Sequence, residues 1–522
     1  MSVIRTFFKI PGNTSIKSIR RRLKTALDSV EVPVRVLQRT YLDSFDSRVY
    51  RAGAIIEENL QGDNRLLSWV SLEDSGSGPM VAIANPSRFI RDIPSGPLKR
   101  RLKPILNIRA LLPVAHLNSE IQQLDIVNKQ GQTTAHLVIE DNRISMAGSD
   151  DIRLGRLLYL QSVKGHRKQY QKAIAILMNK FAPDSAPLPL PLQAMAAVGY
   201  EPGTYSTSLA LHLLPQMRTD TALRGILSAL YKIMLANESG LKEDLDSEFL
   251  HDYRIAIRHN RVLLGQIKGI IPEKIVEEFR RGFSWLGEIS SPCRDMDVHL
   301  LKFSGYKKGL PRAIRDDIDP LYEYLLRHKN IEHEKLVELL ESDRYRAFKK
   351  DWQGFLDTQH AETDLPANAS WPVVRVAGDH IWRVYRKINR EGIAINKASP
   401  PEALHELRKS CKKLHYLMEM FQGLYPEKKI IRAINLLKSL QKLLGEYHDL
   451  HIQISSLHRF SDSMREEMDV HEKTCLAINV LIENLDKKQV CVREHFYECF
   501  ARFSSVRNRK YFKSLFKPEI NN

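Results

Sequence analysis

The sequence predicts a multidomain α+β protein, in which an antiparallel β domain of tunnel-like or barrel-like shape precedes an all-helical bundle. Three observations predict this order. Residues 32–160 contain short β-prone segments between turn residues, a Pro-rich stretch follows at 182–193, and amphipathic helical spacing dominates beyond residue 220. The length of 522 residues also exceeds that of one ordinary domain. We therefore expect two domains with a linker between them.

The β-rich region has six segments that are typical of strands. They read RVLQRTYL, AGAIIEE, RLLSWVSLE, PMVAIAN, IQQLDIVN and TTAHLVIE. Helical spacing follows at 165–181, and the stretch APDSAPLPLPLQ then predicts a break because proline cannot donate a backbone hydrogen bond. We expect a β-rich domain at 1–185, a linker at 186–205 and a helical domain at 206–520.

The helical domain shows the 3.6-residue periodicity of amphipathic helices along its whole length. Helices are predicted at about 220–236, 247–269, 273–288, 294–303, 312–328, 331–340, 372–391, 401–422, 428–446, 448–460 and 464–501. Similar segments recur, which divides the domain into halves at about 220–345 and 370–500. Duplication of this kind predicts a bundle with pseudo-twofold symmetry.

The chain is strongly basic. Seventy-nine Lys and Arg residues oppose 62 Asp and Glu residues, which gives a net charge of +17. Such an excess favours polyanionic partners, namely nucleic acid, a phosphate polymer or an anionic lipid surface. Five cysteines without a C-x-x-C pair indicate neither a disulfide framework nor a zinc site, and no cofactor is expected. No apolar run reaches the ~20 residues of a membrane helix, so we expect a cytoplasmic protein without membrane contact.

One basic helix occurs twice, as FLHDYRIAIRHNRVLL and as ALHELRKSCKKLHYLMEMF. The candidate binding residues are His251, Arg254, Arg258 and Arg261 in the first copy and His405, Arg408, Lys409, Lys412 and Lys413 in the second. At about 100° per residue, positions i, i+3, i+7 and i+10 fall within a sector of roughly 80°. Each helix therefore presents a stripe of cations opposite an apolar face.

An aspartate follows each basic helix at the same distance. Asp295 and Asp449 each lie 44 residues after the histidine of their copy, and each comes soon after a Leu-Gly pair. We expect a glycine-marked turn and an acid to recur with each basic helix, so that both stripes reach one cleft. We expect the aspartates either to orient a histidine or a neighbouring arginine or only to cap a helix, and Arg294 and Tyr416 are further candidate supporting residues.

The stripes have more than one chemical interpretation. Arginine matches phosphate oxygens with a planar fork, and lysine supplies a compact charge, so a phosphate chain fits the stripes. A solvated Lys/Arg face is the plain alternative, but its repetition argues against chance. Nucleic-acid binding by the same bundle is a further alternative, although no recognised nucleic-acid motif occurs. A histidine metal site is disfavoured because the neighbouring cations would repel a divalent ion.

The two basic helices resemble the signature helices of the CHAD family, and CRDMDV and LLGEYHDL resemble its turn-acid segments. This resemblance covers about residues 205–515. It implies a helical bundle whose basic groove binds inorganic polyphosphate, sometimes at polyphosphate granules, and it places the residues of both stripes in that groove. His259 and His415 stand where the family commonly has other basic residues, which predicts an affinity that changes mildly between about pH 6 and pH 8.

The amino-terminal region resembles a CYTH domain, the tunnel-shaped fold of triphosphate-processing enzymes. The resemblance rests on RTYLDSFDSRVYRAG and on LLPVAHLNSEIQQLDIVNKQGQTTAHLVIEDNRI. The E-x-E-x-K strand that opens such domains is missing from the first forty residues, so we expect a degenerate, non-catalytic scaffold. A metal-dependent triphosphatase is the alternative function. Its candidate ligands, Glu57, Glu58, Glu140 and Asp141, are better explained as solvent-facing acids.

Overall fold

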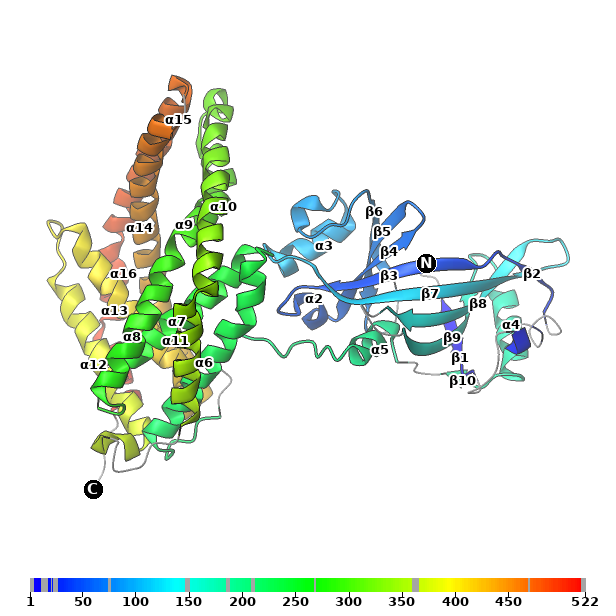
Figure 1. Cartoon of the computed structure of the whole chain (residues 1–522), viewed down its shortest axis with the longest axis horizontal. Helices are drawn as coiled ribbons and strands as arrows, with labels where there is room; N and C mark the ends of the chain where they lie inside the picture. The colour runs from blue at the N-terminus through cyan, green and yellow to red at the C-terminus, as the bar shows by residue number, and fades with distance from the viewer. Residues whose placement is uncertain are drawn as a thin grey trace. The chain divides into compact units, whose positions relative to one another are not determined.

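The computed structural model describes residues 4–10, 17–19, 21, 27–73, 77–145, 151–184, 188–207, 212–266, 269–358, 366–467 and 470–517. They form two compact units, Met1–Ser206 and Thr207–Asn522. The first unit is built on β-strands and the second is helical (Figure 1). The predicted fold class, an antiparallel β domain followed by a helical bundle, is confirmed. Within these ranges, no helix is long and apolar enough to cross a membrane.

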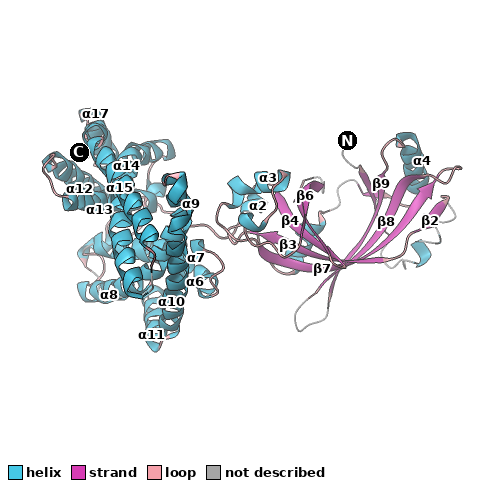
Figure 2. Cartoon of the chain, turned by 90° about the horizontal axis from the view of Figure 1, so that it is seen from above, coloured by secondary structure: helices cyan, strands magenta, loops and turns pink. Residues whose placement is uncertain are grey.

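The first unit contains one antiparallel sheet of ten described strands. They are β1 (Arg5–Phe8), β2 (Ser29–Glu31), β3 (Arg35–Asp43), β4 (Ala54–Gln61), β5 (Asn64–Ser71), β6 (Ser77–Ile83), β7 (Leu112–Val127), β8 (Thr133–Ile144), β9 (Ile152–Ser162) and β10 (Pro183–Asp184). Their order is β10-β1-β9-β8-β7-β3-β4-β5-β6, and β2 pairs with β7. The sheet is open and bends into a trough whose long central strand is β7 (Figure 2).

Three helices pack against the sheet through buried apolar side chains. Helix α3 (Pro97–Leu106) packs against β4 and β5 through Leu98 and Leu102, and α4 (Arg167–Met178) packs against β8 and β9 through Leu177. Helix α5 (Leu190–Ala197) packs against Tyr41 and Val70 and lines the cavity inside the trough. The concave side of the sheet is therefore partly filled by α5.

The prediction of a linker at 186–205 is wrong for residues 190–197. These residues form helix α5, and Ala194 and Met195 are buried against the sheet. Proline does not prevent this helix because Pro189 caps it and Pro191 lies in its first turn, where no intrahelical donor is needed. Helix α5 thus belongs to the core of the sheet unit.

The second unit is an assembly of long helices (Figure 1). They are α6 (Thr219–Lys242), α7 (Ser247–Gln266), α8 (Glu273–Ile289), α9 (Ser291–Gly309), α10 (Asp319–Glu341), α11 (Asp343–Asp357), α12 (Val373–Ala394), α13 (Pro401–Met420), α14 (Glu427–Glu467), α15 (Glu472–Glu494), α16 (Phe496–Phe503) and α17 (Val506–Phe516). One apolar core joins α9, α10, α14 and α15 through Phe303, Leu321, Leu457 and Ile478.

The helix order reflects the duplication expected from the sequence. The pair α6–α7 corresponds to α12–α13, and the basic helices are α7 and α13. The copies differ beyond the basic helix. The segment with Asp295 lies just past the break between α8 and α9, whereas Asp449 lies inside the uninterrupted helix α14. The predicted glycine-marked turn of the second copy is therefore wrong, since Gly445 continues the helix in open surroundings.

Candidate phosphate-binding site on the basic helices

The two basic helices contact each other directly. Arg258 Nη1 on α7 donates a hydrogen bond to the Tyr416 hydroxyl on α13 over 3.2 Å, and the rings of His259 and Tyr416 lie 4.4 Å apart. Four cations gather around this contact, and repulsion within the group contributes to lowering the pKa values of Arg254, Arg408 and Lys412. We call this group the basic cluster, and it consists of Arg254, Arg258, Arg408 and Lys412.

Arg254 is the most firmly anchored member of the basic cluster. Its Nη1 donates to the Gly287 carbonyl over 2.9 Å and to the Ser290 hydroxyl over 2.6 Å, and its Nη2 donates to the Ser291 hydroxyl over 3.0 Å. Burial, followed by repulsion from Arg258, lowers the pKa of Arg254 to about 10. Arg254 therefore stays charged near neutrality, but most of its donors hold α7 to the junction of α8 and α9.

Arg408 and Lys412 keep unused donors. The buried Nε of Arg408 has no acceptor among the described residues, while its Nη2 lies 3.4 Å from Asp449 Oδ1. Within the same ranges, Lys412 forms no hydrogen bond or ion pair. Burial, followed by repulsion from Arg408 and Arg258, lowers the pKa of Lys412 to about 8. An anion at this position would satisfy both donors and relieve the repulsion.

The two aspartates lie beside arginines of the basic cluster. Asp449 approaches Arg408, and Asp295 occupies the corresponding place beside Arg254. Burial raises the pKa of Asp295, although Arg254 opposes this shift. Neither aspartate occupies an N-cap position, so the helix-capping alternative is wrong. Their role is to balance part of the cationic charge.

Several predicted site residues lie outside the basic cluster. The guanidinium of Arg261 lies against Gly287 of α8, where an added Cβ would come within 3.2 Å of Nη1. Lys409 is exposed and pairs with Glu406 over 2.8 Å. Arg294 Nη1 donates to the Ser247 carbonyl at the start of α7, and Lys413 faces α12.

The two predicted histidines, His251 and His405, have different surroundings. His251 lies half-buried one turn before Arg254. His405 Nδ1 lies 3.0 Å from His448 Nδ1, at a cavity of about 230 Å³ that His451 also lines. Burial lowers the pKa of His448 to about 3, with further contributions from Arg408 and His405. His448 is therefore neutral at physiological pH.

The expected pH dependence between pH 6 and pH 8 is wrong for His259. This ring is buried against Tyr416, and burial lowers its pKa to about 4. His259 is therefore neutral at both values. His415 instead lies 3.1 Å from Glu419.

Two cations near the basic cluster were not expected from the repeat. Lys302 on α9 lies close to Asp449, and Arg459 on α14 lies close to Asp295. Burial lowers the pKa of Lys302. The repeat gave no signal for them, because the residues at the corresponding positions are Ser456 and Gly305. The spacing of seven residues from Asp295 to Lys302 places both on one helix face and is the usable clue.

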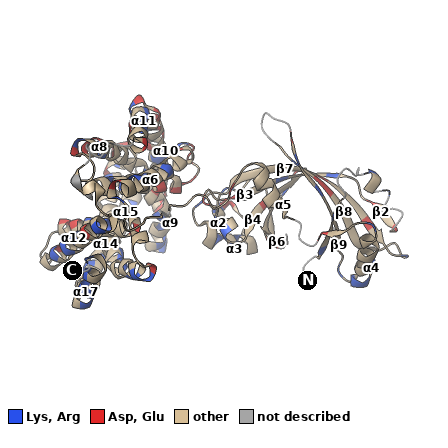
Figure 3. Ribbon diagram, turned by 90° about the horizontal axis from the view of Figure 1, so that it is seen from below, with Lys and Arg blue, Asp and Glu red and all other residues tan. Residues whose placement is uncertain are grey.

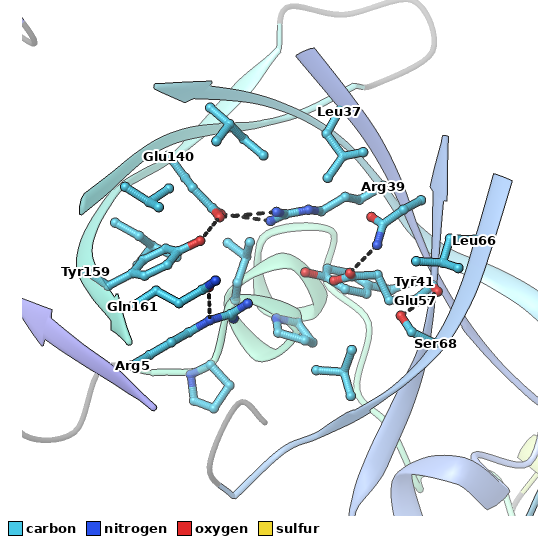
Figure 4. A pocket seen from close by; sticks show the side chains of 18 of the residues that line it. Arg5, Leu37, Arg39, Tyr41, Glu57, Leu66, Ser68, Glu140, Tyr159 and Gln161 are labelled. Carbon is cyan, nitrogen blue, oxygen red and sulfur yellow. Dashed lines mark hydrogen bonds and ion pairs between the residues drawn. The ribbon is translucent and has the colours of Figure 1, made fainter. Parts of the chain in front are cut away.

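The trough of the sheet unit holds a cavity of about 330 Å³ (Figure 4). Arg39 on β3 reaches Glu140 on β8 with two hydrogen bonds of 2.9 and 3.3 Å, and the Tyr159 hydroxyl donates to Glu140 over 2.6 Å. Burial alone would raise the pKa of Glu140, but Arg39 and Tyr159 lower it overall. Strand β1 adds Arg5 and Phe7 to the lining and no carboxylate.

The prediction that the acids considered as metal ligands face the solvent is wrong for three of the four, whereas Glu57 is half-buried and lines the cavity. Glu58, Glu140 and Asp141 are buried, and they pair with Arg65, Arg39 and Arg153 respectively. Pairing with arginine explains why strand acids tolerate burial here. In the described part of the chain, no three His, Cys, Asp or Glu side chains gather where they could hold a metal ion.

Comparison with known proteins identifies the helical unit. Residues 225–458 match the CHAD domain family, so this unit contains a CHAD domain, as the two basic helices predicted. Among curated proteins, none matches the chain.

Solved structures similar to the chain cover each unit. The CHAD domain from the plant Ricinus communis is 19% identical, with a TM-score of 0.48 over 58% of this chain and 96% of that one. PptA from Streptomyces chartreusis is 14% identical, with a TM-score of 0.43 over 54% of this chain and 99% of that one. A Hippeastrum protein described as having a dominant triphosphatase activity is 11% identical, with a TM-score of 0.27 over 40% of this chain and 100% of that one.

Proposed function

We propose that the helical unit binds inorganic polyphosphate, with the basic cluster as its main contact. The observation that carries this proposal is the pair of unused donors, the buried Arg408 Nε and the Lys412 ammonium. A buried donor without an acceptor costs free energy, and neighbouring cations repel each other. A chain of phosphate groups supplies acceptors and negative charge together, and so removes both costs.

The basic cluster also carries positive charge that is not paired with an acid within the described ranges, and bound phosphate would balance this charge. Each arginine of the pair Arg254 and Arg408 has one aspartate beside it, whereas Arg258 and Lys412 form no ion pair with a carboxylate among the described residues. Elsewhere in the helical unit, basic and acidic residues occur on the same helices (Figure 3). Association with polyphosphate granules would follow from this binding, and it forms part of the proposal.

The test replaces Arg258, Arg408 and Lys412 together by glutamine. Arg254 is left in place because it anchors α7, so its loss would confuse binding with folding. We expect affinity for long-chain polyphosphate to fall on the order of a hundredfold or more, since three charge-assisted contacts are removed. Titration at fixed salt measures this, because polyanion binding weakens steeply with ionic strength.

The matched control removes the same charge elsewhere. Lys308, Lys350 and Lys473 are exposed residues of α9, α11 and α15 that form no ion pair within the described residues. Replacing these three by glutamine should change the affinity by about twofold or less. An equal loss in both variants would reduce the proposal to general attraction by net charge, and an unchanged affinity of the first variant would refute it.

A further inference from the structure

A second basic surface lies on the other flank of α13. It surrounds a pocket of about 730 Å³ that is lined by α12, by Lys413 on α13 and by Arg509 in the first turn of α17. We call it the α12 pocket. Its cations are Arg383, Arg386, Lys387, Arg390, Lys413 and Arg509. No acid is found among the described residues that line it, so its lining is more one-sided in charge than the basic cluster.

The sequence of α12 produces this surface by helical spacing. Arg383, Arg386, Lys387 and Arg390 follow the pattern i, i+3, i+4 and i+7, which places them on one face. The opposite face, including Ile381 and Ile388, is buried in the bundle. The helix is therefore fixed with its four cations toward the pocket and solvent. The corresponding helix of the first copy, α6, has no such stripe, since it carries only Lys232 at an equivalent position.

The cations of the α12 pocket are largely unbalanced. Lys387 lies 3.4 Å from Glu391, whereas Arg383, Arg386 and Arg390 have no acceptor within the described residues. Lys413 is half-buried, and its pKa is lowered by burial first and then by repulsion from Lys387 and Arg280. Figure 3 shows basic residues on α12 and α17, the two helices that contribute most of these side chains. An anion in the pocket would relieve this repulsion.

The pocket and the basic cluster are joined through α13. Lys412 belongs to the cluster and Lys413 lines the pocket, and consecutive residues of a helix point about 100° apart. Their Cα atoms lie about 3.8 Å apart, as for any two neighbours along a chain. A flexible phosphate chain that leaves the cluster at Lys412 can therefore continue around α13 to Lys413, whereas a short phosphate fills the cluster alone.

We propose that the α12 pocket is a second phosphate site that takes the continuation of a polyphosphate chain held in the basic cluster, so that the protein distinguishes long chains from short ones. This inference rests on the proposed function. Beyond that function, it assigns a further part of the phosphate chain to the α12 pocket. It also predicts that the protein binds long chains more tightly than short ones. An exposed basic face that merely remains hydrated would give no such preference.

The test uses the full chain with Arg383, Arg386 and Arg390 replaced by glutamine. These residues are exposed, so the fold is expected to remain. The probes are long-chain inorganic polyphosphate and tripolyphosphate, titrated at one salt concentration. We expect affinity for the long chain to fall about tenfold and affinity for tripolyphosphate to change about twofold or less. The control variant with Lys308, Lys350 and Lys473 replaced by glutamine should resemble the unmodified chain with both probes.

The outcomes separate the two proposals. If the α12-pocket variant binds the long chain like the control variant, or if both probes weaken equally, the second site is refuted. In that case the variant with Arg258, Arg408 and Lys412 replaced still decides the proposed function. If the unmodified chain binds neither probe, the proposed function itself fails and the second site fails with it.

Discussion

Arg408 and Lys409 are neighbours in the sequence, but they differ in burial and in pairing, and therefore in how much each can contribute to binding an anion. Lys409 is exposed and already paired with Glu406, and surface pairs of this kind contribute about 0–1 kcal/mol. The side chain of Arg408 is only 14% exposed, and its Nε has no acceptor among the described residues. An incoming phosphate therefore gains more from Arg408 than from Lys409.

Single substitutions should separate these two residues. We predict that Arg408→Gln weakens binding of long-chain polyphosphate by about tenfold or more, whereas Lys409→Gln weakens it by about twofold or less. Both variants lose one positive charge, so each is the other's control. Titration of the two proteins side by side checks this. Equal losses would show that position on the helix does not matter.

Lys412 gives the binding a pH dependence in the alkaline range. Its pKa is lowered from 10.5 to about 8, so the charged form is present below pH 8 and is lost as the pH rises through that value. Bound phosphate favours the charged form and raises the pKa again. Affinity should therefore fall between pH 7 and pH 9, and binding near pH 8 should take up protons.

The variant Lys412→Arg tests the assignment, because arginine keeps its charge over this range. We predict that its affinity stays nearly constant from pH 7 to pH 9, while that of the unmodified chain declines by up to about tenfold. His259 and His448 do not interfere, since their pKa values of about 4 and about 3 leave them neutral. A decline of the same size in both proteins would assign the effect to another group.

At the scale of elements, α7 is held in place by a close approach to α6. Gly240 on α6 faces the buried ring of Phe249 on α7, and a Cβ at Gly240 would overlap that ring. Gly225 lies on the same helix with open space around it. The glycine at position 240 is thus required by packing, and the one at 225 is not.

Two alanine substitutions should consequently have opposite effects. We predict that Gly240→Ala lowers the free energy of unfolding by about 1–3 kcal/mol through overpacking. Gly225→Ala should raise it by about 0.5–1 kcal/mol, because alanine is the better helix former at an exposed helical position. Denaturant unfolding followed by circular dichroism measures both. A destabilisation of similar size at Gly225 would contradict the packing explanation.

Elements with strong periodicity were predictable, and those decided by tertiary packing were not. The helices α7, α8 and α13 begin within a residue or two of their predicted starts. The predicted division of residues 428–460 into two helices is wrong, since α14 runs unbroken through Gly445. A helical glycine costs about 1 kcal/mol relative to alanine, and packing on both sides of α14 outweighs this. Helix α11 and the packed helix α5 were also missed.

At the scale of the whole molecule, the repeat predicted which helices carry the candidate site. It did not predict which cations of α13 belong to the basic cluster and which line the α12 pocket. Helical spacing groups Arg408, Lys412 and Lys413 together, yet the structure assigns the first two to the basic cluster and the third to the α12 pocket. That division depends on the neighbouring helix, which no pattern within α13 reveals. Likewise, no pattern within the strands revealed that acids of the sheet unit pair with arginines, as Glu140 does with Arg39 and Asp141 with Arg153.

The net charge of +17 would attract any polyanion, so the identity of the ligand is the central question. The most direct measurement is competition on the full chain, with labelled long-chain polyphosphate bound and duplex DNA added at equal phosphate concentration and salt. We predict that DNA displaces only a small fraction, because the donors of Arg408 and Lys412 are half-buried and fit a slender chain better than a wide duplex. Displacement by DNA as complete as by unlabelled polyphosphate would contradict a site built for polyphosphate.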